Sequence, residues 1–128
     1  MASTQKYTQE GFHTITPYLY GGNELVDFLK NVFGAEVIRR GEPEANGNVH
    51  SEVKIGDSPI LIGRGYFADK SMAAAVWIYV PDADASYKKA LSAGAKSVRE
   101  PADQTWGDRV CGVKDSFGNT WWVATHKA

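Results

Sequence analysis

The chain has 128 residues, of which 43% are hydrophobic and 23% charged, proportions that are typical of a globular protein and exclude an intrinsically disordered chain. Its formal net charge is −1 at pH 7, and its lysines and arginines form no block or stripe, which excludes the electrostatic footprint of a nucleic-acid partner. The single cysteine, Cys111, excludes an intrachain disulfide and a cysteine-based zinc site, and we interpret it as a small residue within a strand.

The N-terminal segment and the apolar stretches indicate where in the cell the protein is expected. Residues 1–11 form a polar leader that lacks the apolar core of a signal peptide. The longest apolar stretch, near residues 72–80, is too short to cross a bilayer. We therefore expect a cytoplasmic protein that has neither a membrane nor a nucleic acid as its partner.

The first half of the chain, about residues 12–71, predicts a strand, a helix and three further strands. Residues 12–20 are rich in β-forming side chains. The helix is expected over residues 24–33, with Asn23 as its N-cap and Gly34 as its stop. Shorter apolar segments separated by turns follow, which predict strands over 35–40, 48–55 and 59–63 and a loop over 64–71.

The second half, about residues 72–126, predicts the same order of elements. A strand over 73–80 is followed by a helix over 83–93 that opens at Pro81-Asp82, and by strands over 96–99, 109–114 and 119–125. The two halves repeat at a spacing of about sixty residues. We therefore predict one α+β domain, residues 12–128, that is built from two βαβββ modules.

Several segments resemble one known family. Residues 17–20 (Pro-Tyr-Leu-Tyr) and 33–36 (Phe-Gly-Ala-Glu) look like the opening of PhnB-like proteins, and residues 50–58 look like their middle hairpin. Residues 106–109 and 115–121 (Asp-Ser-Phe-Gly-Asn-Thr-Trp) resemble their C-terminal signature, with serine at position 116 where proline is usual. The chain thus resembles the vicinal-oxygen-chelate superfamily of glyoxalases, bleomycin-resistance proteins and extradiol dioxygenases.

This resemblance implies a fold, an assembly and a possible metal site. The two modules would form a curved mixed-sheet cup around a pocket, with the helices outside, and the protein would form a homodimer. Enzymes of the superfamily hold a divalent ion at four positions, which align here with Thr14, Leu61, Ala75 and Trp122. None of these side chains is a usual ligand of a catalytic metal ion, so we expect no metal and no cofactor.

His50 and Glu52 are the candidate catalytic residues. Side chains alternate along a strand, so His50, Glu52 and Lys54 share one face. A histidine beside a carboxylate is typical of an acid/base pair or of part of a metal site, and equally of a polar strand face. His13 and His126 lie near the chain ends and are weaker candidates.

The same alternation predicts the walls of a pocket that is rich in aromatic side chains, as sites for flat organic ligands usually are. The predicted ligand-binding residues are Thr14, Thr16, Tyr18, Leu61, Trp77, Tyr79, Trp106, Arg109 and Trp122.

Three functions are compatible with these residues. The first is a metal-free protein that binds or sequesters an aromatic small molecule, as bleomycin-resistance proteins do. The second is a lyase, isomerase or dioxygenase that is metal-dependent or uses His50 and Glu52 as acid and base. The third is an interaction module whose function is to form a dimer. The sequence leaves open whether any reaction is catalysed.

Overall fold

The computed structural model describes residues 7–127. Each half contributes one helix and four strands. The first module contains β1 (Tyr18–Tyr20), α1 (Asn23–Phe33), β2 (Glu36–Arg39), β3 (Val49–Ile55) and β4 (Ser58–Arg64). The second module contains β5 (Ala75–Tyr79), α2 (Ala83–Ser92), β6 (Lys96–Asp103), β7 (Asp108–Lys114) and β8 (Thr120–His126).

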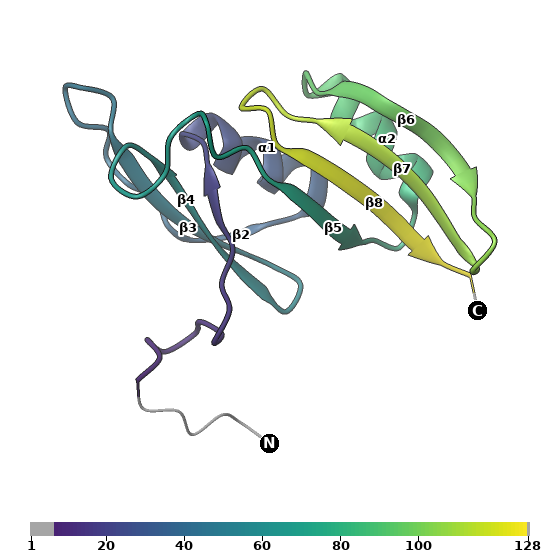
Figure 1. Cartoon of the computed structure of the whole chain (residues 1–128), viewed down its shortest axis with the longest axis horizontal. Helices are drawn as coiled ribbons and strands as arrows, with labels where there is room; N and C mark the ends of the chain where they lie inside the picture. The colour runs from purple at the N-terminus through teal and green to yellow at the C-terminus, as the bar shows by residue number, and fades with distance from the viewer. Residues whose placement is uncertain (1–6, 128) are drawn as a thin grey trace.

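The strands form two separate four-stranded mixed sheets that lie side by side (Figure 1). Their orders are β1-β4-β3-β2 and β5-β8-β7-β6, and in each sheet the first pair is parallel while the others are antiparallel. Helices α1 and α2 contact each other and cover the same side of both sheets. The predicted α+β class with two βαβββ modules and outer helices is therefore confirmed.

Three details of the predicted elements are wrong. The strand expected over residues 96–99 is longer, since β6 runs to Asp103. The first strand begins at Tyr18 rather than at residue 12, because Pro17 has no N–H to donate and Thr14 lies in the segment before the strand. The N-cap of α1 is Gly22, and the Asn23 side chain makes no capping bond. Its amide instead donates to Gly41 O at 2.9 Å and accepts from Ser51 Oγ at 2.7 Å, so Asn23 ties the helix to the strands.

One hydrophobic core runs through both modules on the helix side of the sheets. Alternate strand residues face the helices, as Val53 on β3 and Val123 on β8 do. Phe33 of α1 packs against Trp121 of β8 with ring centroids 5.4 Å apart, so the helix of one module contacts the sheet of the other. No helix among residues 7–127 is long and apolar enough to cross a membrane.

The turn before β8 is organised by a buried carboxylate. Asp115 is 5% exposed and accepts hydrogen bonds from the backbone N–H groups of Phe117 and Asn119 at 2.9 and 3.0 Å. The indole Nε1 of Trp121 donates to the same carboxylate at 2.9 Å. Asp115 thereby fixes both the turn and the ring that fills the centre of the core.

The neighbouring amide of Asn119 joins the two modules. Asn119 is fully buried, and its Nδ2 donates to Tyr20 O at the end of β1 at 3.0 Å. Its Oδ1 accepts from the backbone N–H of Ala74, in the segment between the modules, at 3.0 Å. One side chain therefore satisfies backbone groups of the first module and of the connecting segment, and its Nδ2 also donates to the Asp115 carboxylate of its own turn at 3.2 Å.

We expect Asn119→Ala to lower the free energy of unfolding by about 2–3 kcal/mol, because it leaves the Tyr20 carbonyl and the Ala74 N–H without their partner. Asn31→Ala, at an exposed position of α1, is the matched control and should change stability by less than about 0.5 kcal/mol. Urea unfolding measures both. Equal stability of the two variants would show that Asn119 does not hold the modules together.

Candidate functional site

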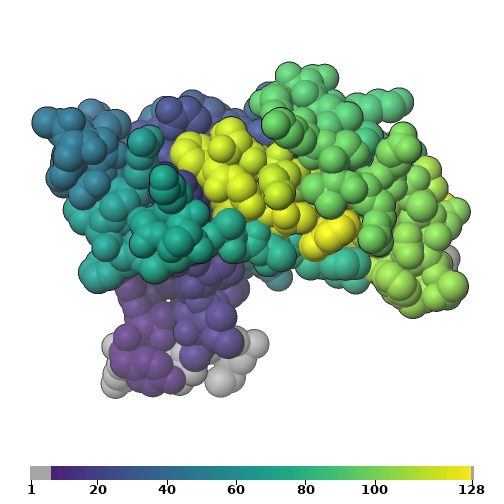
Figure 2. Space-filling view, turned by 45° about the horizontal axis from the view of Figure 1, so that its top comes forward, coloured from purple at the N-terminus to yellow at the C-terminus, as the bar shows by residue number. Residues whose placement is uncertain are grey.

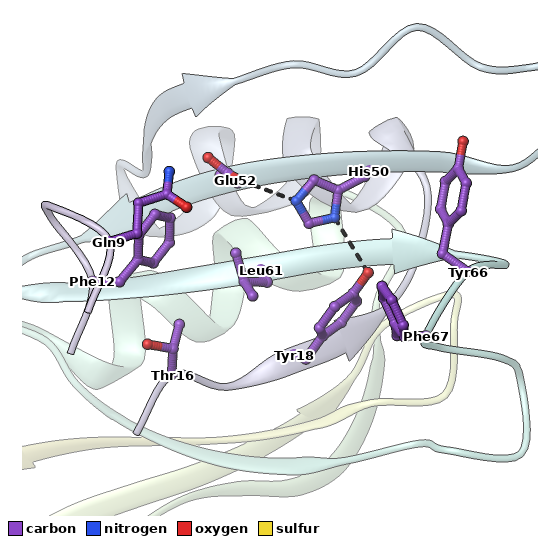
Figure 3. A pocket seen from close by; sticks show the side chains of 9 residues that line it. All are labelled: Gln9, Phe12, Thr16, Tyr18, His50, Glu52, Leu61, Tyr66 and Phe67. Atoms are coloured by element: carbon purple, nitrogen blue, oxygen red, sulfur yellow. Dashed lines mark hydrogen bonds and ion pairs between the residues drawn. The ribbon is translucent and has the colours of Figure 1, made fainter. Parts of the chain in front are cut away.

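A cavity of about 680 Å³ opens on the face of the first sheet that α1 leaves uncovered (Figure 3). Strands β3 and β4 supply its floor, β1 supplies one wall, and the N-terminal segment and the loop after β4 stand at its two ends. Its volume lies within the range of roughly 300–1,000 Å³ that small-molecule sites occupy. The lining residues are Gln9, Phe12, Thr16, Tyr18, His50, Glu52, Leu61, Tyr66 and Phe67.

Three of these side chains form a line of hydrogen bonds along the floor (Figure 3). Tyr18 OH lies 3.2 Å from His50 Nδ1, and His50 Nε2 lies 3.0 Å from Glu52 Oε2. A carboxylate only accepts hydrogen bonds, so Nε2 carries the imidazole proton and Nδ1 accepts from the tyrosine. Burial raises the pKa of the Tyr18 hydroxyl, which keeps it a donor to His50.

A glycine makes this arrangement possible. A Cβ atom at Gly63, on the same face of β4, would lie 2.6 Å from Tyr18 OH. The tyrosine ring can therefore cross β4 to reach His50 only because position 63 has no side chain. The side chains of His50 and Glu52 are 31% and 12% exposed, so the histidine faces the cavity while the carboxylate lies deeper.

The rim of the cavity carries aromatic residues that sequence reasoning missed. Tyr66 has a φ of 55°, a left-handed conformation that is uncommon outside glycine, and its hydroxyl donates to Glu44. Phe67 packs edge-on against Tyr18 with ring centroids 6.4 Å apart. The only signal in the sequence was a Tyr-Phe pair in a loop, and nothing in it places that loop over β1.

The second sheet also has an uncovered face, and it carries four of the predicted ligand-binding residues. Trp77, Tyr79 and Trp106 are 44%, 62% and 59% exposed, and Trp122 lies opposite Trp77 in the β5–β8 register. A Cβ atom at Gly112 would lie 2.6 Å from the Trp122 ring, so glycine again lets an aromatic ring lie across the sheet. Figure 2 shows β8 (yellow) at the surface of the molecule.

The structure therefore divides the predicted ligand-binding residues. Thr16, Tyr18 and Leu61 line the first cavity together with His50 and Glu52, whereas Trp77, Tyr79, Trp106 and Trp122 belong to the second sheet. These placements leave their predicted role in ligand binding untested.

Arg109 and Thr14 lie in neither group. Arg109 Nε donates to Asp84 Oδ1 of α2 at 2.6 Å and Arg109 NH1 to Asp103 Oδ1 at 3.2 Å, on the helix side of β7. Neighbouring residues of a strand point to opposite faces, so Asp108 faces the open side while Arg109 does not. Thr14 lies before β1 and does not line the cavity.

The sequence matches a known family over most of its length. The family model of the Glyoxalase/Bleomycin resistance protein/Dioxygenase superfamily matches residues 22–123. The chain belongs to this superfamily. It is 32% identical over 108 residues to the uncharacterized protein Mb0911c of Mycobacterium bovis, a match that covers 75% of this chain and 70% of that protein. The uncharacterized protein Rv0887c of Mycobacterium tuberculosis is equally similar, and the chain spans 63% of its length.

A solved structure has a similar fold. The crystal structure of TioX from Micromonospora sp. ML1 superposes with a TM-score of 0.70 and 25% sequence identity. The superposition covers 89% of this chain and 98% of TioX. Both sheets and both helices of this superfamily member therefore have counterparts in a known structure.

The four residues that the sequence resemblance aligns with the superfamily's metal positions are not usual ligands of a divalent ion. Thr14, Leu61, Ala75 and Trp122 offer hydroxyl, aliphatic and indole groups, whereas such ions bind imidazole and carboxylate donors. Across residues 7–127, no group of three or more His, Cys, Asp and Glu side chains is placed to hold a metal ion. At the four aligned positions, the side chains therefore offer no ligand set like the one that the resemblance implies for the superfamily's enzymes.

Cys111 takes no part in either uncovered face. It is fully buried on the helix side of β7, and its Sγ donates to Ala83 O and Val123 O at 3.8 and 3.7 Å. Burial raises the pKa of the thiol to about 11. A thiol that stays protonated and covered is a poor nucleophile.

Proposed function

We propose that this superfamily member binds an aromatic organic molecule, without a metal ion, in the cavity of the first sheet. One observation carries the proposal: aromatic rings wall a cavity of about 680 Å³ whose polar groups gather along its floor. A largely apolar cavity with a few oriented polar groups is the usual character of a small-molecule site. The metal positions that lack imidazole and carboxylate donors support the metal-free form of this function.

The rings favour a flat ligand. Phe12, Tyr18 and Phe67 surround the cavity, and Tyr18 and Phe67 are already held edge-to-face. Aromatic side chains bind flat rings through stacked or edge contacts in addition to the burial of apolar area. The hydrogen-bonded floor then orients the ligand through its polar substituents. The resemblance to bleomycin-resistance proteins agrees with a role in sequestering such a molecule.

Ligand binding is tested by titrating a panel of aromatic compounds while tryptophan emission and the melting temperature are followed. We expect at least one compound to change the emission and, at one hundred times its Kd, to stabilise the protein by about 2.7 kcal/mol. Leu61→Trp should abolish binding, because the indole fills the floor of the cavity. Leu91→Trp, at an exposed position of α2, should bind as the wild type does. A panel that leaves emission and melting temperature unchanged would contradict the proposal.

A second copy of the chain is the proposed partner. Three large aromatic side chains are exposed to solvent: Phe67 by 81%, Trp77 by 44% and Trp106 by 59%. Large apolar side chains that are exposed together on one side of a protein are typical of an interaction surface. A second copy that sets its second sheet against the first sheet would cover these rings and close the cavity. The superfamily resemblance, which implies pairing, supports this arrangement. The cytoplasmic location expected from the sequence stays a prediction.

Sedimentation equilibrium tests the dimer directly. We expect twice the mass of the chain at micromolar concentration, and Trp77→Arg should shift the protein towards the single-chain mass because it places a charge in the contact. Leu91→Arg, which places the same charge at an exposed position of α2, should leave the mass unchanged. A wild-type mass equal to one chain would contradict the proposed partner.

The line Tyr18–His50–Glu52 favours one alternative, a metal-free acid/base enzyme. A histidine oriented by a carboxylate and bonded to a hydroxyl is an arrangement that can move a proton at the hydroxyl oxygen. If the cavity catalyses a reaction, His50→Gln should reduce turnover by 100-fold or more, on the order of what one acid/base group contributes, with an unchanged melting temperature. His13→Gln is the control. Turnover that survives His50→Gln would exclude this alternative.

A further inference from the structure

The second sheet carries a cluster that the proposed function does not use. Asp108, at the start of β7, has a carboxylate that is 1% exposed and accepts three hydrogen bonds from side chains. His126 Nδ1 lies 2.7 Å from Oδ1, while Tyr79 OH and Trp106 Nε1 each donate to Oδ2 at 3.0 Å. Three ring side chains from β5, β8 and a loop thus converge on one buried acid.

The position of the cluster follows from strand pairing. Asp108 and His126 are partners in the antiparallel β7–β8 register, at the far end of the sheet from the first module. Directly opposite residues on one face of such a pair lie about 4.5–5.5 Å apart at their Cβ atoms, close enough for their side chains to bond. Tyr79 comes from β5, which pairs with β8 on its other side. The cluster therefore faces the uncovered side of the second sheet.

The buried acid fixes the tautomer of the histidine. The hydrogen bond from His126, reinforced by those from Trp106 and Tyr79, lowers the pKa of Asp108 against the effect of burial. An ionised carboxylate only accepts, so Nδ1 of His126 carries a proton, and in the neutral form of the ring Nε2 has the lone pair that can accept a hydrogen bond. The His126 side chain is 59% exposed, and among residues 7–127 its Nε2 makes no hydrogen bond.

The other two rings provide the surface beside that lone pair. Tyr79 and Trp106 use their polar groups on Asp108, yet their rings are 62% and 59% exposed. Trp77 extends this surface by an edge contact with Tyr79, with ring centroids 6.2 Å apart. His126 Nε2 is therefore an oriented hydrogen-bond acceptor next to two aromatic rings, and the hydrogen bonds of these rings to Asp108 fix their orientation. A ligand anion would be repelled by the charge on Asp108, whereas a neutral hydroxyl would not.

We propose that His126, oriented by Asp108, accepts a hydrogen bond from the hydroxyl group of a planar aromatic ligand that lies against Tyr79 and Trp106. This inference rests on the proposed function for the aromatic nature of the ligand. It adds the chemical class, a phenol, and a recognition site on the second sheet. His126 is the contacting residue, and Asp108 is a positioning residue that acts through it.

Two probes separate hydrogen bonding from stacking. 4-Methylphenol has the hydroxyl group and is neutral at pH 7, and 4-methylanisole has the same ring with a methyl ether that cannot donate. We expect His126→Phe to weaken the binding of 4-methylphenol about tenfold in equilibrium dialysis, the effect of one hydrogen bond, and to change the binding of 4-methylanisole by less than about twofold. His13→Phe, which replaces an exposed histidine before β1, should leave both affinities unchanged.

Asp108→Asn tests the positioning role. It should weaken the binding of 4-methylphenol and leave that of 4-methylanisole unchanged, whereas a merely structural role would weaken the binding of both probes together. Melting temperatures of the variants identify any loss of fold. If both probes bind and His126→Phe weakens them equally or not at all, this inference is overturned and the proposed function stands. If neither probe nor any compound of the aromatic panel binds, the inference falls together with the proposed function.

Discussion

The contact between the modules decides which surfaces of the molecule remain open. Asn119 bonds the end of β1 and the connecting segment from inside the second module, while Asp115 holds the turn that presents it. Phe33 and Trp121 complete the contact within a core that both helices share. Because this core lies on the helix side, each sheet keeps one face that neither helix covers.

Both open faces are built by the same means. In each sheet a glycine, Gly63 or Gly112, lets a large aromatic ring lie across the neighbouring strand. Each face also carries a histidine paired with a carboxylate, at 3.0 Å in the first sheet and 2.7 Å in the second. Apolar rings with one oriented polar group suit the recognition of flat organic molecules. The two pairs differ in burial and partners, so the faces need not recognise the same part of a ligand.

Two signals in the sequence, the alternation of side chains along strands and the repeated order of elements, predicted most of the fold. They identified both modules and placed Tyr18, Leu61 and Trp122 on the open faces, because a period of two depends only on local geometry. These signals did not predict features that depend on contacts between distant parts of the chain. Pro17 shortens the first strand and leaves Thr14 outside it, and the loop that brings Tyr66 to the cavity has no local signal of its direction. The pairing of Asp108 with His126 depends on a register that only the folded sheet reveals.

The central claim is that the open face of the first sheet holds a flat organic ligand without a metal ion. A crystal structure of the complex with the tightest compound of the aromatic panel tests it most directly. We predict electron density for the ligand among Tyr18, Leu61 and Phe67, with a polar group within hydrogen-bond distance of the Tyr18–His50–Glu52 line. A cavity of the first sheet that stays empty while the ligand binds only elsewhere, or a cation bound by His50 and Glu52 in the cavity, would contradict the account.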